Sequence, residues 1–317
     1  MSIDERPCLI HIGFPRTGST ALQQNLLVRA PDTVYFGKPL TSFSLPMRRL
    51  FVSLLTLERW EWEQRRKRVI EGLLEPLLAR PGARLLISDE ELSTGPLDAR
   101  VDRFEIARRL AELVPQAEIL LVVRDQLELL RSCYCQLVAI DRVDAQGFRP
   151  WVDAQLERPH TFLHLFRISD AAGVWTAHFG PERIHILTHE QLRANPRAFV
   201  DALAPLLGLE PERLWSCYRD VRRNRSVRRR WVALERALAL APWLPDPRDS
   251  RRAFVREAAQ RFVAGGPPLD TDYTTEQRAR LLDYYGPNNR EAAQTWSLPL
   301  AKLGYPTAHP PPKEVPA

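Results

Sequence analysis

Five short apolar segments recur along the chain, and stretches with helical spacing of apolar residues lie between them. The segments cover residues 8–12, 33–36, 84–88, 118–123 and 183–188. Branched and aromatic side chains dominate them, and polar or glycine-containing sequence bounds them, which predicts buried strands. Helices are predicted after Gly18 and over residues 47–79, 104–114, 127–140 and 162–179. This alternation predicts an α/β fold of three layers, with a central parallel sheet flanked by helices and ligands bound beyond the strands' carboxyl ends.

The pattern changes beyond Leu209, where helices and loops carry many arginines. From Ala308 the chain is rich in proline, which predicts a loose tail. A length of 317 residues allows a substantial core. We therefore predict a single domain over residues 1–307, with an arginine-rich helical part from about residue 210, and a tail over residues 308–317.

The first apolar segment runs into a turn that contains Gly13, Pro15 and Gly18. A strand, a glycine-containing turn and a helix direct backbone N–H groups and the positive helix end at one point, which suits a phosphate-like anion. The two glycines have the spacing of the nucleoside triphosphate loop G-x-x-x-x-G-K-[ST]. However, Ser19 stands where that loop has its lysine, and the cation of this turn is Arg16. Ordinary kinase or NTPase chemistry is therefore disfavoured.

The sequence of this turn, residues 15–20, resembles the loop of the sulfotransferases that use 3′-phosphoadenosine 5′-phosphosulfate (PAPS). Their pattern P-[KR]-[ST]-G-[ST]-[ST] fits at every position, with Arg16 where most relatives have lysine. The resemblance implies a sulfotransferase architecture similar to that of P-loop NTPases. It also implies that the 5′-phosphosulfate is bound by Pro15, Arg16, Thr17, Gly18, Ser19 and Thr20.

A second similarity to these enzymes follows the apolar segment 118–123, where Arg124 is followed eight residues later by Ser132. In the family, an arginine and a serine at this spacing bind the 3′-phosphate of PAPS. A guanidinium fork and a hydroxyl suit a phosphate dianion. Gln126 stands where many relatives have proline. A third similarity extends through Glu190 to Leu209, and we interpret it as architecture, with Glu190 as a helix-start carboxylate.

Three acidic residues follow the third apolar segment, and sulfuryl transfer to an alcohol needs a base. The resemblance to bacterial-type sulfotransferases points to Glu90. Ser88 and Glu91 have the spacing of a capping box, which favours a structural role for Glu91 and leaves Glu90 as the freer carboxylate. The alternative is that all three acids lie in a solvent-exposed loop without a catalytic role. Lys38 is a second catalytic candidate by analogy with relatives that act on glycosaminoglycans. Pro39 follows it where those relatives often have a catalytic glutamate, so a surface role for Lys38 is an equal alternative.

Seven arginines crowd residues 219–230. Related enzymes have a basic loop here that closes over the 3′-phosphate or the acceptor, and Arg225 or Arg228 would serve that role. A solvated basic helix face is the alternative. The apolar residues 231–240 that follow would permit peripheral contact with an anionic membrane, although packing against the main domain is favoured.

The amino-acid composition indicates which class of protein the chain belongs to. The chain has 44% hydrophobic and 26% charged residues, as a globular protein has, and its net charge of +6 suits an anionic cofactor or acceptor without indicating nucleic acid. Four cysteines without zinc spacing predict free thiols, and no basic-then-apolar leader begins the sequence. No apolar run reaches the roughly 20 residues of a membrane span. These features predict a cytoplasmic protein without a metal site.

Together the motifs predict an enzyme that transfers the sulfonate of PAPS in line to a hydroxyl, or less favourably an amine, of a carbohydrate, lipid or small molecule. A carboxylate base takes the proton, and 3′,5′-ADP (PAP) is the other product. No metal is required, because the leaving phosphate is already stable as an anion. An atypical P-loop kinase or NTPase is the first alternative, and a basic nucleic-acid-binding module is the second.

Overall fold

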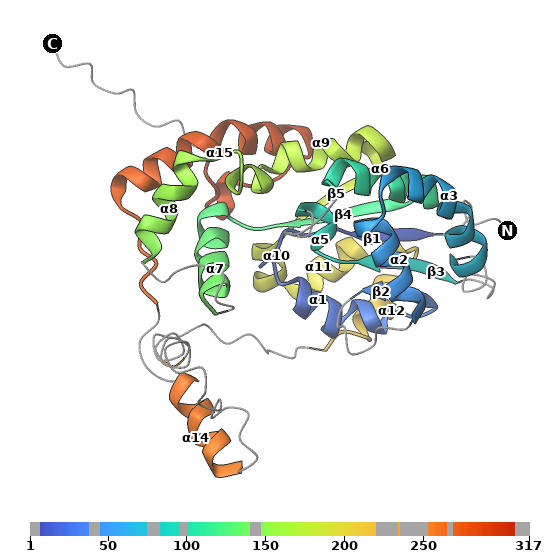
Figure 1. Cartoon of the computed structure of the whole chain (residues 1–317), viewed down its shortest axis with the longest axis horizontal. Coiled ribbons are helices and arrows are strands. Elements are labelled where there is room, and N and C mark those ends of the chain that lie inside the picture. Colours follow the sequence, from blue (N-terminus) through green and yellow to red (C-terminus); the bar gives the residue numbers. More distant parts are fainter. Residues whose placement is uncertain are drawn as a thin grey trace.

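A single parallel sheet lies at the centre of the computed structural model, which describes residues 7–37, 45–74, 83–94, 101–139, 147–219, 234, 253–264 and 269–307. The strand order is β2-β3-β1-β4-β5, and every neighbouring pair is parallel (Figure 1). The strands are β1 (Cys8–His11), β2 (Thr33–Gly37), β3 (Arg84–Ser88), β4 (Glu118–Val123) and β5 (Ile184–Thr188). All five were predicted from the sequence. After β1 the chain forms β2 and β3 on one side of β1, and then β4 and β5 on its other side. The strand order therefore reverses between β1 and β4, and parallel sheets bind ligands at such a point.

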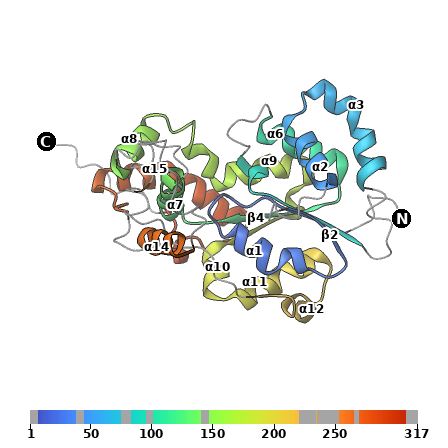
Figure 2. The same ribbon diagram turned by 60° about the horizontal axis from the view of Figure 1, so that its bottom comes forward.

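Helices cover both faces of the sheet, as predicted (Figure 2). Leu9 and Ile10 are adjacent and fully buried in different apolar clusters, because successive side chains of a strand point to opposite faces. The cluster around Ile10 includes residues of α2 (Leu45–Thr56), α3 (Arg59–Val69), α6 (Arg103–Leu113), α7 (Gln126–Ala139), α8 (Phe148–Glu157), α9 (Ile168–Phe179) and α15 (Thr275–Thr295). The cluster around Leu9 includes residues of α1 (Ser19–Asn25), α11 (Pro196–Leu203) and α12 (Pro211–Trp215).

Two predicted helices are interrupted. The helix expected over residues 47–79 is α2 and α3, separated at Glu58, whose backbone N–H donates to Glu61 in a capping box and so starts a new helix; a π-helical turn, Ile70–Leu74, follows α3. The helix expected over residues 162–179 is a 3₁₀ turn, Leu163–Phe166, and then α9, because Arg167 between them is extended. The predictions for α6 and α7 are confirmed within a residue or two.

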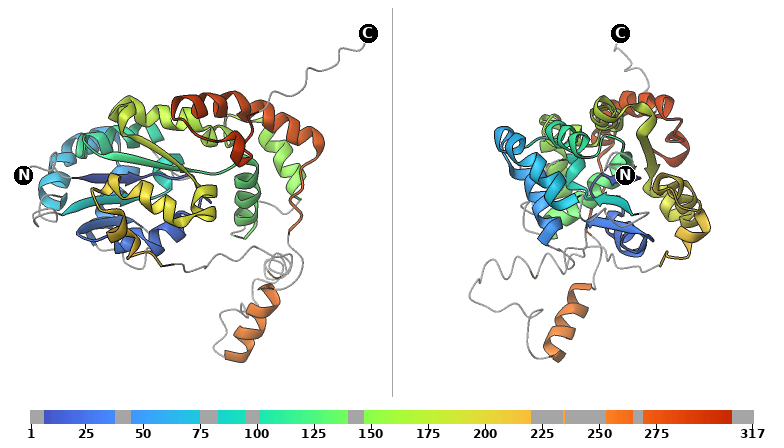
Figure 3. Two further views of the ribbon diagram at one scale, coloured as in Figure 1. Left: turned by 180° about the vertical axis from the view of Figure 1, so that it is seen from behind. Right: turned by 90° about the vertical axis from the view of Figure 1, so that its right-hand side faces the viewer.

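The C-terminal part adds helices that apolar spacing did not locate individually. The longest helix among the described residues, α15, packs along α8 and α9 (Figure 3). The other α-helices in the described ranges are α5 (Glu91–Thr94), α10 (His189–Ala194) and α14 (Ala253–Ala264). Within the described ranges, no helix is both long and apolar enough to cross a bilayer. The expected tail over residues 308–317 and, apart from residue 234, the segment 231–240 lie outside the described residues.

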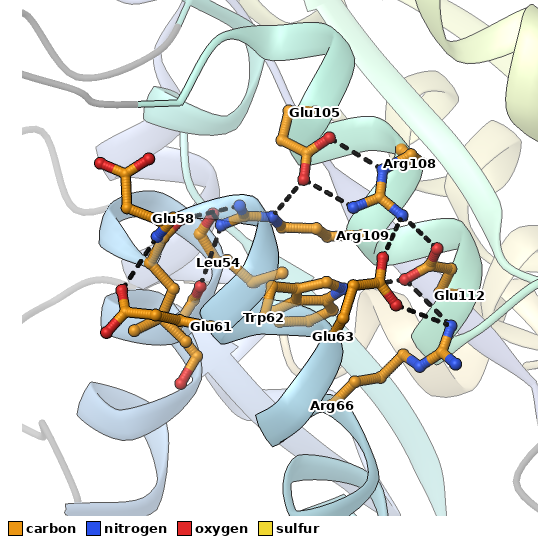
Figure 4. Close-up of polar contacts among 12 residues, drawn as sticks. Leu54, Glu58, Glu61, Trp62, Glu63, Arg66, Glu105, Arg108, Arg109 and Glu112 are labelled. Carbon is orange, nitrogen blue, oxygen red and sulfur yellow. Dashed lines mark hydrogen bonds and ion pairs between the residues drawn. The ribbon is translucent and has the colours of Figure 1, made fainter.

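One buried arginine joins α2, α3 and α6 (Figure 4). Only 1% of Arg109 is exposed, and its guanidinium donates to the carbonyl oxygens of Leu54 and Leu57 at 3.0 and 2.7 Å, which satisfies the end of α2. Its Nε donates to Glu105 at 2.8 Å, and its charge lies 5.2 Å from the ring centre of Trp62. This contact fixes the helices that cover one face of the sheet.

Candidate functional site

The turn after β1 runs alongside β4 before it bends. Beyond the strand pairing, the backbone N–H groups of Ile12 and Phe14 each donate at 2.9 Å to the carbonyls of Leu120 and Val122. The turn therefore reaches the carboxyl end of β4, directly beside Arg124. The strand order thus brings together two motifs that are more than a hundred residues apart in the sequence.

Two residues of the turn have left-handed backbone conformations. Arg16 has a φ of 65° and Gly18 a φ of 84°, and Gly18 is the N-cap of α1. The Thr17 hydroxyl donates to the Phe14 carbonyl at 2.6 Å and so holds the bend from inside. This conformation leads directly into α1, whose first N–H groups have no partner within the helix. The predicted anion-binding loop is therefore formed as a tight turn before a helix.

Arg16, Arg124 and Ser132 are in direct contact. The Nε of Arg16 donates to the Oγ of Ser132 at 2.9 Å, and Nη1 of Arg124 donates to the Arg16 carbonyl at 3.0 Å. The Arg124 side chain is 17% exposed, so part of it remains accessible while this contact holds it. The two predicted anion-binding groups form one continuous basic site.

His189 also contacts the loop, and its role was not predicted. It is the first residue of α10, and its Nδ1 donates to the Thr17 carbonyl at 2.8 Å. Burial lowers the pKa of His189, and the charge of Arg124 lowers it further, so at neutral pH the ring is neutral with its proton on Nδ1. A polar residue directly after a parallel strand was the available sequence signal.

Glu190 joins three segments behind this site. Its two carboxylate oxygens accept from the Asp125 backbone N–H at 3.2 Å and from the Tyr305 hydroxyl at 2.7 Å. Glu190 is thus satisfied at the start of α10, as expected. Burial raises the pKa of Asp125 to about 6, and the neighbouring carboxylates of Glu128 and Glu190 contribute.

The glutamine found where many relatives have proline makes a specific contact. The fully buried amide of Gln126 pairs reciprocally with that of Asn289 in α15, at 2.7 and 3.0 Å. Gln126 also begins α7. The turn that presents Arg124 is therefore fixed by an amide pair to the C-terminal helix.

The acidic turn after β3 differs from its prediction in one respect. Asp89 accepts from the Glu91 backbone N–H at 3.0 Å, so Asp89 caps α5 and the predicted capping role of Ser88 is wrong. Ser88 is buried at the end of β3, where its hydroxyl pairs with Nδ1 of His11 at 2.8 Å and accepts from Gln23 at 3.0 Å. The Ser88 hydroxyl therefore bonds to His11 on the neighbouring strand β1, and not to the start of α5 as the local spacing had suggested.

Glu90 lies in a turn that is tied to the anion-binding loop. Its carbonyl accepts from the hydroxyl of Ser93 at 2.9 Å, and the same hydroxyl lies 3.2 Å from the carbonyl oxygen of Gly13. Burial lowers the pKa of His11 to about 4, and the nearby charge of Glu90 partly offsets this shift. The structure thus brings the predicted base and the predicted anion loop to the same edge of the sheet.

Three predicted site residues lie outside the described part of the chain: Lys38, Arg225 and Arg228. Their roles stay predictions. Among the described residues, no group of histidine, cysteine and acidic side chains could hold a metal ion.

The profile of the sulfotransferase family matches residues 7–213. The chain belongs to the sulfotransferase family. The match includes the loop, the Glu90 turn, Arg124 and His189, and it ends before α15. The family assignment makes this protein a transferase enzyme.

A solved sulfotransferase structure agrees with this fold. A sulfotransferase from Alicyclobacillus acidocaldarius is similar with a TM-score of 0.53 and 16% identity, over 94% of this chain and 98% of that one. The sulfotransferase domain from the curacin biosynthetic pathway has a TM-score of 0.39 at 16% identity, over 88% and 98% of the two chains, and this more distant likeness supports no conclusion. No curated protein sequence matches the chain.

Proposed function

We propose that this sulfotransferase uses PAPS as its donor and transfers the sulfonate to a hydroxyl, or an amine, of a carbohydrate, lipid or small-molecule acceptor. The observation that carries the proposal is the contact of Arg16 with both Ser132 and Arg124. PAPS bears a phosphate on each side of one ribose, so its two anionic groups need adjacent binding sites. The loop at residues 15–20 suits the 5′-phosphosulfate, and Arg124 with Ser132 suits the 3′-phosphate.

The residues at the sheet edge fit an in-line transfer. Glu90 would take the proton of the acceptor hydroxyl while the acceptor oxygen bonds to sulfur and the bond between sulfur and the bridging oxygen breaks. Arg16 and the loop N–H groups would stabilise the negative charge that develops on the departing phosphate. Lys38 remains a second catalytic candidate.

A transfer assay with radiolabelled PAPS and a panel of hydroxyl and amine acceptors tests the activity. Ligand-induced thermal shifts test the donor, because a ligand at 100 times its Kd stabilises the fold by about 2.7 kcal/mol. We expect PAP to raise Tm and ATP or an oligonucleotide to leave it unchanged. Arg16→Ala and Arg124→Ala should abolish the PAP shift. Magnesium-dependent ATP turnover with no PAP shift would instead support the kinase alternative.

A further inference from the structure

A cavity of about 620 Å³ lies on the outer side of Arg124. The first turns of α7, α10, α15 and residues 303–306 bound it. Arg278, Leu282 and the segment 303–306 therefore form a wall that lies beyond residues 7–213, which the family profile matches. This wall therefore comes from the C-terminal part of the chain, outside the region that the family profile matches.

The cavity lining is rich in charge, with four arginines and three carboxylates. Its carboxylates are engaged with the protein itself. Glu128 pairs with Arg131 at 2.7 Å and lies 3.8 Å from Arg124, and Glu190 is bonded to Tyr305 and to the Asp125 backbone. Arg131 is also held, because it donates to the Thr271 carbonyl at 3.1 Å. These contacts hold Glu128 and Glu190 in place, and the lining contains one more arginine than carboxylates.

Two arginines of the lining stand apart from this network. The side chains of Arg193 on α10 and Arg278 on α15 form no hydrogen bond and no ion pair with any described residue. Both are exposed at the cavity, and they come from different helices. Their charges and that of Arg124 act on one cavity, and Arg193 also helps to lower the pKa of His189. Unpaired guanidinium groups around a cavity suit an anion with several acceptor oxygens.

The cavity adjoins the proposed donor site through shared residues. Arg124 and His189 line it, and the same two side chains bond to the carbonyls of Arg16 and Thr17 on the loop. A second phosphate bound by Arg124 would therefore lie next to a side chain that also lines this cavity. PAPS and PAP have that second phosphate on the 3′ oxygen.

We propose that Arg193 and Arg278 extend the 3′-phosphate site of this enzyme, so that α10 and α15 make the protein select nucleotides with a 3′-phosphate. This inference rests on the proposed use of PAPS. It adds to Arg124 and Ser132 two residues that no sequence motif indicated. The C-terminal helix then takes part in donor selection as well as in packing.

Calorimetric titration of the full chain with 3′,5′-ADP and with 5′-AMP tests this inference, since the two nucleotides differ only in the 3′-phosphate. We expect Arg193→Gln and Arg278→Gln each to weaken binding of 3′,5′-ADP about tenfold, as loss of a charge-assisted hydrogen bond does. Binding of 5′-AMP should not change. Arg280→Gln is the matched control, because Arg280 is on α15 but donates to the Leu156 carbonyl at 3.3 Å and does not line the cavity.

The outcomes separate the two proposals. If the wild type binds 3′,5′-ADP and both variants keep its affinity, the role of the two arginines is wrong while the donor assignment stands. The role is equally wrong if the variants lose affinity for both nucleotides to the same extent. If the wild type does not prefer 3′,5′-ADP over 5′-AMP, the donor proposal fails and this inference fails with it. Melting curves without ligand show whether each variant is folded.

Discussion

Arg16 donates a hydrogen bond from Nε to the Oγ of Ser132 at 2.9 Å, although 116 positions separate the two residues. One follows β1 and the other lies on α7, which follows β4. Since β1 and β4 are neighbours in the sheet, their carboxyl ends bring both side chains to one place. The sheet order therefore creates the basic site. The segment after β1 contributes a loop with backbone N–H groups, and the segment after β4 contributes Arg124 and the Ser132 hydroxyl.

Replacing Ser132 by alanine should weaken PAP binding. The hydroxyl accepts from Arg16 and, on the proposed function, also binds the 3′-phosphate. A hydrogen bond to a charged group contributes about 1.5–3 kcal/mol, so Kd should rise roughly tenfold or more. Calorimetry measures the change. Ser216→Ala is the control, because the Ser216 hydroxyl bonds only locally, to the Arg213 carbonyl at 2.8 Å. An unchanged Kd for Ser132→Ala would remove Ser132 from the donor site.

Glu90→Gln should reduce turnover while leaving donor binding intact. An amide keeps the shape of the carboxyl group but does not take the acceptor proton, and general-base catalysis typically contributes about 10²–10⁴-fold. We expect kcat to fall by that order and the Kd for PAP to remain at the wild-type value. Glu91→Gln is the matched control on the next residue. If Glu91→Gln loses activity and Glu90→Gln does not, the base is Glu91.

The sequence predicted what depends on local pattern. Buried parallel strands read as continuous apolar runs, so all five were found. The roles proposed for the loop and Arg124 rest on short motifs that the sequence also shows. The contacts that fix these motifs were not predictable, since their partners are remote. Glu190 and Tyr305 are 115 positions apart, and Gln126 and Asn289 are 163 apart.

The wrong prediction that Ser88 caps a helix has the same cause, a contact with a residue that is remote in the sequence. Local spacing made Ser88 a capping residue, but the hydroxyl faces His11 on the adjacent strand at 2.8 Å. A hydrogen bond within the sheet satisfied Ser88, and the next residue, Asp89, took the cap. Spacing alone does not reveal which way a residue at a strand end points.

Gly18→Ala should destabilise the loop. Gly18 has a φ of 84°, where a side chain costs about 1–2 kcal/mol, and an added Cβ would lie 3.0 Å from Nδ1 of His189. We expect a lower Tm and weaker PAP binding. Gly173→Ala is the opposing control, because Gly173 lies within α9 with nothing within 4 Å of an added Cβ, and alanine there should stabilise the helix by roughly 0.5–1 kcal/mol. Equal effects of both substitutions on Tm would contradict the strained geometry at Gly18.

Stability in acid should depend on Glu105. Hydrogen bonds from Arg108, and then from Arg109, lower the pKa of this carboxyl from its ordinary 4.5 to about 2. Because the folded-state value is the lower one, the stabilisation is complete above about pH 4.5 and is lost as the pH falls toward 2. Glu105→Gln also leaves buried Arg109 without its ion pair, which should cost about 2 kcal/mol, less than the ~3–5 kcal/mol of a fully buried pair.

Urea unfolding at neutral pH and near pH 3 measures this dependence. We expect the wild type to lose stability between the two conditions and Glu105→Gln, already weaker at neutral pH, to lose less. Glu71→Gln is the control, because Glu71 pairs with Lys67 at 3.6 Å with side chains 56% and 81% exposed, and such a surface pair contributes little. A Glu105→Gln protein as stable as the wild type at neutral pH would mean that the carbonyls at the end of α2 alone compensate the Arg109 charge.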